Sequence, residues 1–189
     1  MRIGWPNYKD DRASQIVEFA VSLPLLVFFV VGIFDFSSAL SLKQKLTNAA
    51  REGARVAAAG PFSDLGSPPA TGAPASVSDA YQTVDYYLLS EKINDCGLAG
   101  TTPTQTAGTL KWSSPSLTGC PGGTGLTLTI DRGCITAQTS GQSSINVVDT
   151  CVTIVYPYSW RFTGVSGLFG GSFIPPISIT TTAVAFNEN

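Results

Sequence analysis

The sequence predicts an α+β protein in which a long N-terminal helix precedes a small domain of one further helix and an antiparallel β-sheet. Two observations predict this class. Hydrophobic residues make up 43% of the 189 residues and charged residues only 13%, and an unusually long apolar run lies near the N-terminus. After residue 125, apolar residues alternate with threonine, as in strands with one buried face. An anchor followed by a folded domain is therefore expected.

The first predicted element is an apolar helix. Between Phe19 and Leu42, a run of 24 residues, the one charged side chain is Asp35. A helix of that length reaches roughly 36 Å, enough to cross a hydrocarbon core of about 30 Å. We therefore expect a transmembrane segment at about residues 19–42. Two other interpretations stay open: a plain membrane anchor, and an export signal cleaved after Ser37-Ser38-Ala39.

The predicted helix continues beyond the apolar run. Residues 40–59 contain no proline, and small or apolar residues recur at spacings of three and four: Leu42, Leu46, Ala49, Gly53, Val56 and Gly60. Gly60-Pro61 then ends the helix, which would span residues 14–59 and measure roughly 69 Å. These small residues permit close packing, either against the chain's own domain or against other copies.

A linker and a folded head are expected to follow. Residues 60–78 are rich in proline, glycine, serine and alanine, the composition of a linker. Residues 79–189 form the predicted α+β head. Its helix begins at the capping-box spacing of Ser76 to Asp79 and ends near Gly97, and strands are expected at 126–130, 146–156 and 177–186.

Four cysteines indicate the chemistry and the compartment of the head. They are Cys96, Cys120, Cys134 and Cys151, and all follow the apolar run. Their spacings of 24, 14 and 17 do not resemble paired metal-binding motifs, so two disulfides in an oxidising periplasm are favoured over a zinc site. This places the N-terminus in the cytoplasm. Three connectivities exist, and we favour Cys134 with Cys151 across a predicted hairpin, and Cys96 with Cys120.

Composition argues against several classes of function. The chain has no histidine, which excludes a Ser/His/Asp triad, a Cys/His dyad and a His-ligated zinc site. The carboxylates Asp79, Asp85 and Glu91 scatter around their helix, and no base or nucleophile is visible beside Asp131 or Asp149. A net charge of −2 argues against nucleic acid as the main partner. We expect no enzyme activity, no cofactor and no metal.

Four segments near the N-terminus form a distinctive combination: Ser14-Gln15-Ile16-Val17-Glu18-Phe19-Ala20, Leu23-Pro24-Leu25-Leu26, Gly32-Ile33-Phe34-Asp35 and Asn48-Ala49-Ala50-Arg51-Glu52-Gly53-Ala54-Arg55. Together they resemble the start of the TadE-like proteins, the minor pilins or pseudopilins of tight-adherence (Tad) pilus systems. The resemblance covers residues 12–59 well, and residues 151–158 and 177–185 are loosely similar to the family's two closing strands. It implies a type IV pilin-like fold.

The resemblance also implies a processing site and an assembly residue. In such proteins a prepilin peptidase removes a hydrophilic leader and leaves glutamate at the fifth mature position, so Glu18 places the cut between Ala13 and Ser14 and makes residues 1–13 the leader. The family usually has glycine where this chain has Ala13. Cleavage would create an α-amine on Ser14, one helical turn from Glu18 of its own or a neighbouring chain.

The same resemblance implies a location, partners and a role. The protein would span the bacterial inner membrane once, with its head in the periplasm, and could also be incorporated in a surface pilus. Its partners would be the major pilin, other minor pilins, the prepilin peptidase, inner-membrane platform proteins and membrane lipid, in a homo- or hetero-oligomer. Its role would be to prime, initiate or cap pilus assembly. The alternative is a single-pass membrane protein with a periplasmic binding or sensor domain.

Overall fold

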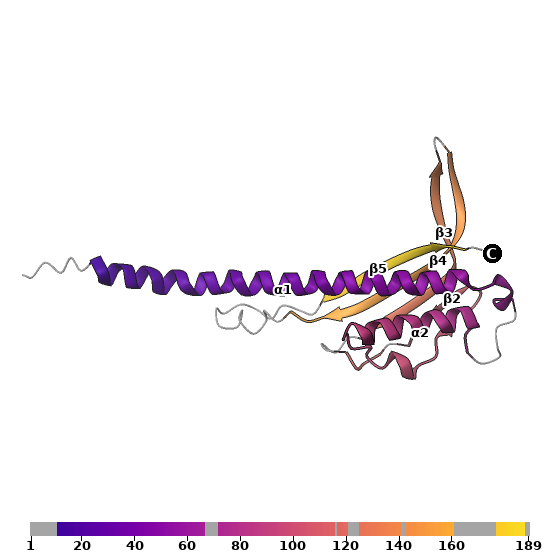
Figure 1. Ribbon diagram of the computed structural model, residues 1–189, viewed down its shortest axis with the longest axis horizontal. Helices are drawn as coiled ribbons and strands as arrows, with labels where there is room; N and C mark the ends of the chain where they lie inside the picture. Colours follow the sequence, from indigo (N-terminus) through magenta and orange to yellow (C-terminus); the bar gives the residue numbers. More distant parts are fainter. Residues whose placement is uncertain are drawn as a thin grey trace, which may run out of the picture. The chain divides into compact units, whose positions relative to one another are not determined.

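The computed structural model describes residues 11–66, 72–115, 117–120, 125–140, 143–160 and 177–187, and it confirms the predicted α+β class. It contains a long N-terminal helix, a second helix and a five-stranded antiparallel sheet (Figure 1). The chain divides into two compact units. Helix α1 (Asp11–Ala59) contributes residues up to Ser38 to the first unit and residues from Ala39 onward to the second.

In the first unit, α1 is strongly apolar and exposed. Among the described residues, α1 is the one helix that is long and apolar enough to cross a membrane, judged by length and composition. None of its most apolar 18-residue stretch is buried. Phe19, Phe29 and Phe34 are 65%, 60% and 71% exposed, so this surface requires lipid or a protein partner. The structure thus supports a candidate transmembrane segment in the predicted place.

The second helix, α2 (Ala75–Ser90), ends earlier than the sequence predicted. Lys92 adopts a left-handed conformation (φ 57°), and the N–H groups of Lys92 and Ile93 donate to the carbonyls of Leu89 and Leu88. This is the hydrogen-bond pattern with which helices commonly terminate, although glycine usually occupies the left-handed position. The helix therefore ends at Ser90, just before the left-handed Lys92, rather than near Gly97. Between α1 and α2 lies the short 3₁₀ helix η1 (Phe62–Asp64), and a second, η2 (Leu98–Gly100), follows α2.

The sheet has the order β1-β2-β3-β4-β5, and every neighbouring pair is antiparallel. Its strands are β1 (Thr104–Gln105), β2 (Lys111–Ser113), β3 (Thr127–Ser140), β4 (Ser143–Tyr158) and β5 (Ile177–Phe186). Strand β3 is much longer than predicted, because beyond residue 131 it pairs with β4 alone in a two-stranded ribbon. A β-bulge between Asp131 and Cys134 separates the sheet from this ribbon.

The core lies between the helices and one face of the sheet. The buried residues of α1 are mostly alanine, and the inward residues of α2 and of the central strands are buried with them. From α1 these are Leu46, Ala49, Ala50, Ala54 and Ala57; from α2, Val77, Ala80, Val84 and Leu88; and from β3 and β4, Leu128, Ile130, Val152 and Ile154. Of the two packing partners left open by the sequence, the chain's own domain covers this part of the stripe. Alanine in these positions allows the close approach of helix and sheet.

An arginine that the sequence did not single out closes one end of the core. Arg132 is completely buried beside the β-bulge and donates from Nη2 to the carbonyl of Gly60 at 2.8 Å, at the end of α1. Its guanidinium lies 5.1 Å from the ring centre of Phe62. Burial lowers the pKa of Arg132, and the carboxylate of Asp64 opposes this change. Arg132 thus connects the end of α1 and η1 to the sheet.

Gly53 provides a test of how closely the helices pack. A β-carbon at this position would lie 2.5 Å from Cγ2 of Val84 and 3.7 Å from Cγ1 of Val152, both fully buried. We expect Gly53→Ala to destabilise the second unit by about 1–3 kcal/mol, because the stiff valine must move, although alanine favours helix. Thermal unfolding of the full chain in detergent measures this. Gly32→Ala, which meets no atom within 4 Å, is the control and should be neutral or stabilising.

Candidate assembly site and the disulfide-bonded head

Ser14 and Glu18 share one face of α1. They are separated by one helical turn and border a shallow hollow on the helix surface, lined by Ser14, Val17, Glu18, Val21, Ser22 and Leu25. Both side chains are exposed, and Glu18 forms no hydrogen bond or ion pair with another described residue. The carboxylate is therefore available to a cation. The predicted cleavage bond after Ala13 lies in the first turn of α1, where helices fray most readily.

Asp35 behaves differently from its neighbours in the apolar segment. Its side chain is 3% exposed, whereas Phe34 and Phe36 on either side are 71% and 58% exposed. A carboxylate within a membrane segment is costly when it faces lipid, and such residues usually face protein. The sequence marked Asp35 as the one charge in the run, but only the structure shows that it is shielded.

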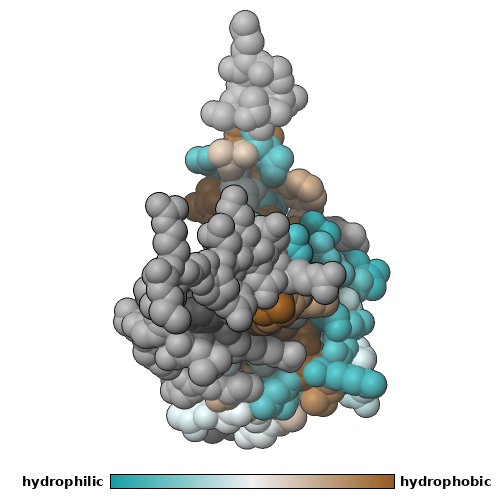
Figure 2. All heavy atoms as spheres, turned by 90° about the vertical axis from the view of Figure 1, so that its left-hand side faces the viewer, coloured by the Kyte–Doolittle hydropathy of each residue, from teal (hydrophilic) through white to brown (hydrophobic). Residues whose placement is uncertain are grey.

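The part of α1 in the second unit carries a polar face. A groove there is lined by Lys43, Gln44, Thr47, Asn48 and Arg51. Nearby, Nζ of Lys45 lies 3.1 Å from Oε2 of Glu91, an ion pair that is half-exposed and contributes at most about 1 kcal/mol. In Figure 2, hydrophilic residues gather on the right-hand side of the described surface, with hydrophobic residues showing beside them. That view presents a mixed surface rather than a single apolar patch.

The structure confirms that the head contains two disulfides, and it joins Cys96 to Cys120 and Cys134 to Cys151, the pairing favoured from the sequence. Asn94 organises the first of them. Its Oδ1 accepts the Cys96 N–H at 2.8 Å, its Nδ2 donates to the Gly119 carbonyl at 3.2 Å, and its own carbonyl accepts the Tyr156 hydroxyl at 3.1 Å. This disulfide therefore joins the segment after α2 to the loop before β3, and the Tyr156 hydrogen bond connects the same segment to β4.

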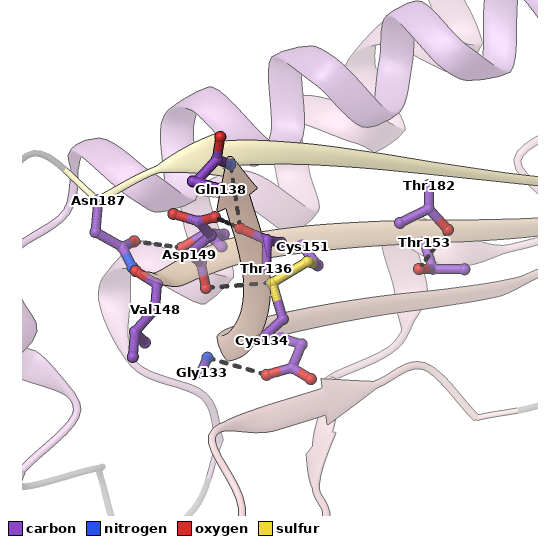
Figure 3. Close-up of a disulfide and its surroundings, with 12 residues drawn as sticks. Gly133, Cys134, Thr136, Gln138, Val148, Asp149, Cys151, Thr153, Thr182 and Asn187 are labelled. Atoms are coloured by element: carbon purple, nitrogen blue, oxygen red, sulfur yellow. Dashed lines mark hydrogen bonds between the residues drawn. A yellow bond between two sulfur atoms is a disulfide. The ribbon is translucent and has the colours of Figure 1, made fainter. Parts of the chain in front are cut away.

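The second disulfide lies at the base of the β3–β4 ribbon (Figure 3). Beside it, Asp149 is completely buried and accepts a hydrogen bond from Thr136 across the ribbon. Asn187 donates from Nδ2 to the Val148 carbonyl at 2.8 Å and accepts from Thr150 at 2.6 Å. A covalent bond and several polar contacts thus hold the ribbon base to the sheet.

The structure brings together two carboxyl groups that the sequence did not pair. Asp85 on α2 is 8% exposed, and its Oδ1 has no hydrogen-bond partner among the described residues. Burial raises the pKa of Asp85, and the neighbouring carboxyl of Asp95 raises it further. Burial also raises the pKa of Tyr81 and of Tyr156, which border the same region. In the described ranges, no three residues of the types His, Cys, Asp or Glu could together hold a metal ion.

The Asp85 carboxyl predicts a pH-dependent stability. Because folding raises its pKa above the ordinary 3.8, the folded chain binds this proton more readily than the unfolded chain, and stability increases as the pH falls through the folded-state value. At neutral pH the ionised group is unfavourable. We expect Asp85→Asn to stabilise the protein at pH 7 by on the order of 1 kcal/mol. Thermal unfolding across pH 3–7 should show this gain disappear toward the acidic end, and a gain equal at all pH values would contradict it.

These features define a class: a protein with a candidate N-terminal membrane helix and a disulfide-bonded α+β head, whose exposed Glu18 lies near the start of that helix. A family model described as TadE-like protein matches residues 13–55, which confirms the resemblance predicted from the sequence. The matched segment lies within α1 and contains Ser14 and Glu18. Comparison with curated proteins and with solved structures returned no match.

Proposed function

We propose that this chain is a membrane-anchored minor pilin or pseudopilin that primes, initiates or caps assembly of a Tad-type pilus. The observation that carries the proposal is the family match over residues 13–55, the segment that places exposed Glu18 one turn after Ser14 on an apolar helix. The role is structural and requires no catalysis. Its partners are the major pilin, other minor pilins and the inner-membrane platform.

The proposed mechanism follows from the charge of Glu18. A prepilin peptidase removes residues 1–13 and exposes the α-amine of Ser14, a cation at neutral pH. As the helix leaves lipid for a seam between helices, an unpaired carboxylate is costly, and a neighbouring subunit's amine removes that cost. Pairing of the two groups therefore selects a correctly processed subunit and sets its axial position in the assembly.

Topology supports the same assignment. The candidate membrane helix precedes all four cysteines, and both disulfides lie in the second unit. Disulfides persist in oxidising compartments, so we place the head in the periplasm and the N-terminus in the cytoplasm, where a prepilin peptidase cleaves. The protein then crosses the inner membrane once.

N-terminal sequencing of the mature protein, isolated from membranes and from sheared surface fibres, tests the proposal. Ser14 as the first residue supports a processed pilin-like subunit. Met1 in a functional assembly contradicts processing, removes the amine from the mechanism and favours a simple anchor with a periplasmic binding or sensor domain. Leu40 indicates an exported domain without a membrane helix and contradicts the proposal.

A further inference from the structure

The β3–β4 ribbon, defined as Cys134–Asp149, has backbone edges that no described strand occupies. Strand β2 stops opposite Asp131, and β5 stops opposite Asp149. Beyond these points the register from Ile135↔Val148 to Ser140↔Ser143 joins β3 and β4 to each other. In Figure 1 the ribbon stands away from the rest of the sheet. Each strand therefore presents a row of N–H and C=O groups suited to another extended backbone.

The side chains of the ribbon also favour contact with protein. Ile135 and Val148 are cross-strand partners and are 68% and 51% exposed, so they form an apolar pair on one face. Ile145, which is 57% exposed, lies opposite Gln138 on the other face. An isolated two-stranded ribbon with an exposed apolar pair is marginally stable in water. A further strand would supply the missing backbone partners and place its own side chains beside these residues.

The ribbon lacks the devices that normally prevent pairing between copies. Natural edge strands carry lysine, other charges or proline, because identical charges repel when two copies align. From Ile135 to Val148 this chain has no charged residue and no proline. A different protein would ordinarily be selected through charges complementary to those of the ribbon, and the residues from Ile135 to Val148 carry no charge. An uncharged edge is instead complementary to itself.

From these observations we infer that two copies of the chain pair through their ribbons, edge to edge and antiparallel, about a two-fold axis. The Cys134–Cys151 disulfide and the Asn187 contact to Val148 hold the base of the ribbon, which lowers the ordering cost of pairing. Six residues per strand make a small interface. Anchoring of both copies in one membrane supplies the effective concentration that such a contact needs.

Cysteine cross-linking in the full-length protein tests the inference. The four native cysteines are paired, so a single added thiol reports contact between copies. We would introduce Ile145→Cys, Asn146→Cys and Val147→Cys separately, and Thr102→Cys at an exposed position outside the ribbon as control. Mild oxidation in native membranes is expected to link two copies at one or more of the three ribbon positions and not at position 102. Absence of cross-links at all three ribbon positions, or links solely to a different protein, overturns the inference.

A charge substitution provides the second arm. Asn146→Lys places a like charge on the edge of each copy, and we expect it to lower the dimer fraction in mild detergent about tenfold, measured by native mass spectrometry. Thr102→Lys, the matched control, should leave that fraction unchanged. Circular dichroism must show that both variants fold alike. Equal dimer fractions in the two variants would contradict ribbon pairing. The inference goes beyond the pilus role and does not depend on cleavage at Ser14, so the two proposals fail separately.

Discussion

Glu18→Ala is expected to abolish pilus assembly while the protein still inserts in the membrane. The substitution removes the carboxylate and leaves the apolar run from Phe19 to Leu42 unchanged, so insertion does not suffer. Between the helices of neighbouring subunits, where the dielectric constant is low, a Ser14 α-amine without the Glu18 carboxylate costs several kcal/mol. Each 1.4 kcal/mol changes the assembly equilibrium about tenfold. Surface pili counted by electron microscopy should therefore fall by more than about tenfold, with unchanged protein in the membrane fraction.

A matched control separates the role of this carboxylate from a general effect of charge. Glu52→Ala removes a glutamate of the same helix whose carboxylate lies 3.2 Å from Nη2 of Arg55, in an exposed pair. Such pairs contribute little, so piliation should stay near the wild-type level. Co-purification with other pilus subunits should be lost in Glu18→Ala and retained in Glu52→Ala. Normal piliation of the Glu18 variant would refute the pairing mechanism.

Trp112→Ala is expected to cause the largest loss of stability in the head, about 3–5 kcal/mol. Trp112 on β2 lies opposite Ile130 of β3, is 1% exposed and is among the largest fully buried side chains. Truncation leaves a large cavity between the sheet and the helices, because neighbouring strands relax only in part. Far-UV circular dichroism during denaturant unfolding of the full chain in detergent measures the change without relying on tryptophan fluorescence.

Two further variants sharpen this test. Trp112→Phe keeps most of the apolar volume and also removes an indole N–H that has no hydrogen-bond partner among the described residues, so its cost should be clearly smaller. Tyr86→Ala truncates an aromatic residue on α2 that is 78% exposed, and it should have little effect. A loss for Trp112→Ala no greater than that for Tyr86→Ala would show that the core is not organised around this side chain.

Much of the fold could be predicted because its signals are local. The apolar run of 24 residues is long enough for a helix that crosses a membrane, and alternation of leucine or isoleucine with threonine after residue 125 specifies a strand. The two disulfides followed from an even number of cysteines without metal-type spacing. The helix end at Ser90 was missed because a lysine in the left-handed region, here Lys92, carries no sequence signal.

The candidate site was predictable in part. Glu18 and Ser14 were named from the resemblance to TadE-like proteins, and the family match over residues 13–55 includes both. Their roles in processing and assembly stay predictions. The Asp85–Asp95 neighbourhood could not be predicted, because the chain turns between them at Lys92 and sequence separation no longer reports distance. Burial of Asp35 could likewise not be predicted from the sequence, because no local pattern shows which side of an apolar helix is covered.

The sequence by itself determined the class of the protein, an apolar N-terminal helix followed by a disulfide-bonded α+β head, because hydropathy, periodicity and cysteine chemistry are properties of neighbouring residues. Tertiary structure alone decided which partner covers the small residues of α1. It seats Gly53 against Val84 and Val152 of the chain's own core. It alone also placed Arg132 in the core and extended β3 and β4 into a ribbon with no charged residue from Ile135 to Val148. Such outcomes depend on contacts between residues distant in sequence, which a linear pattern does not encode.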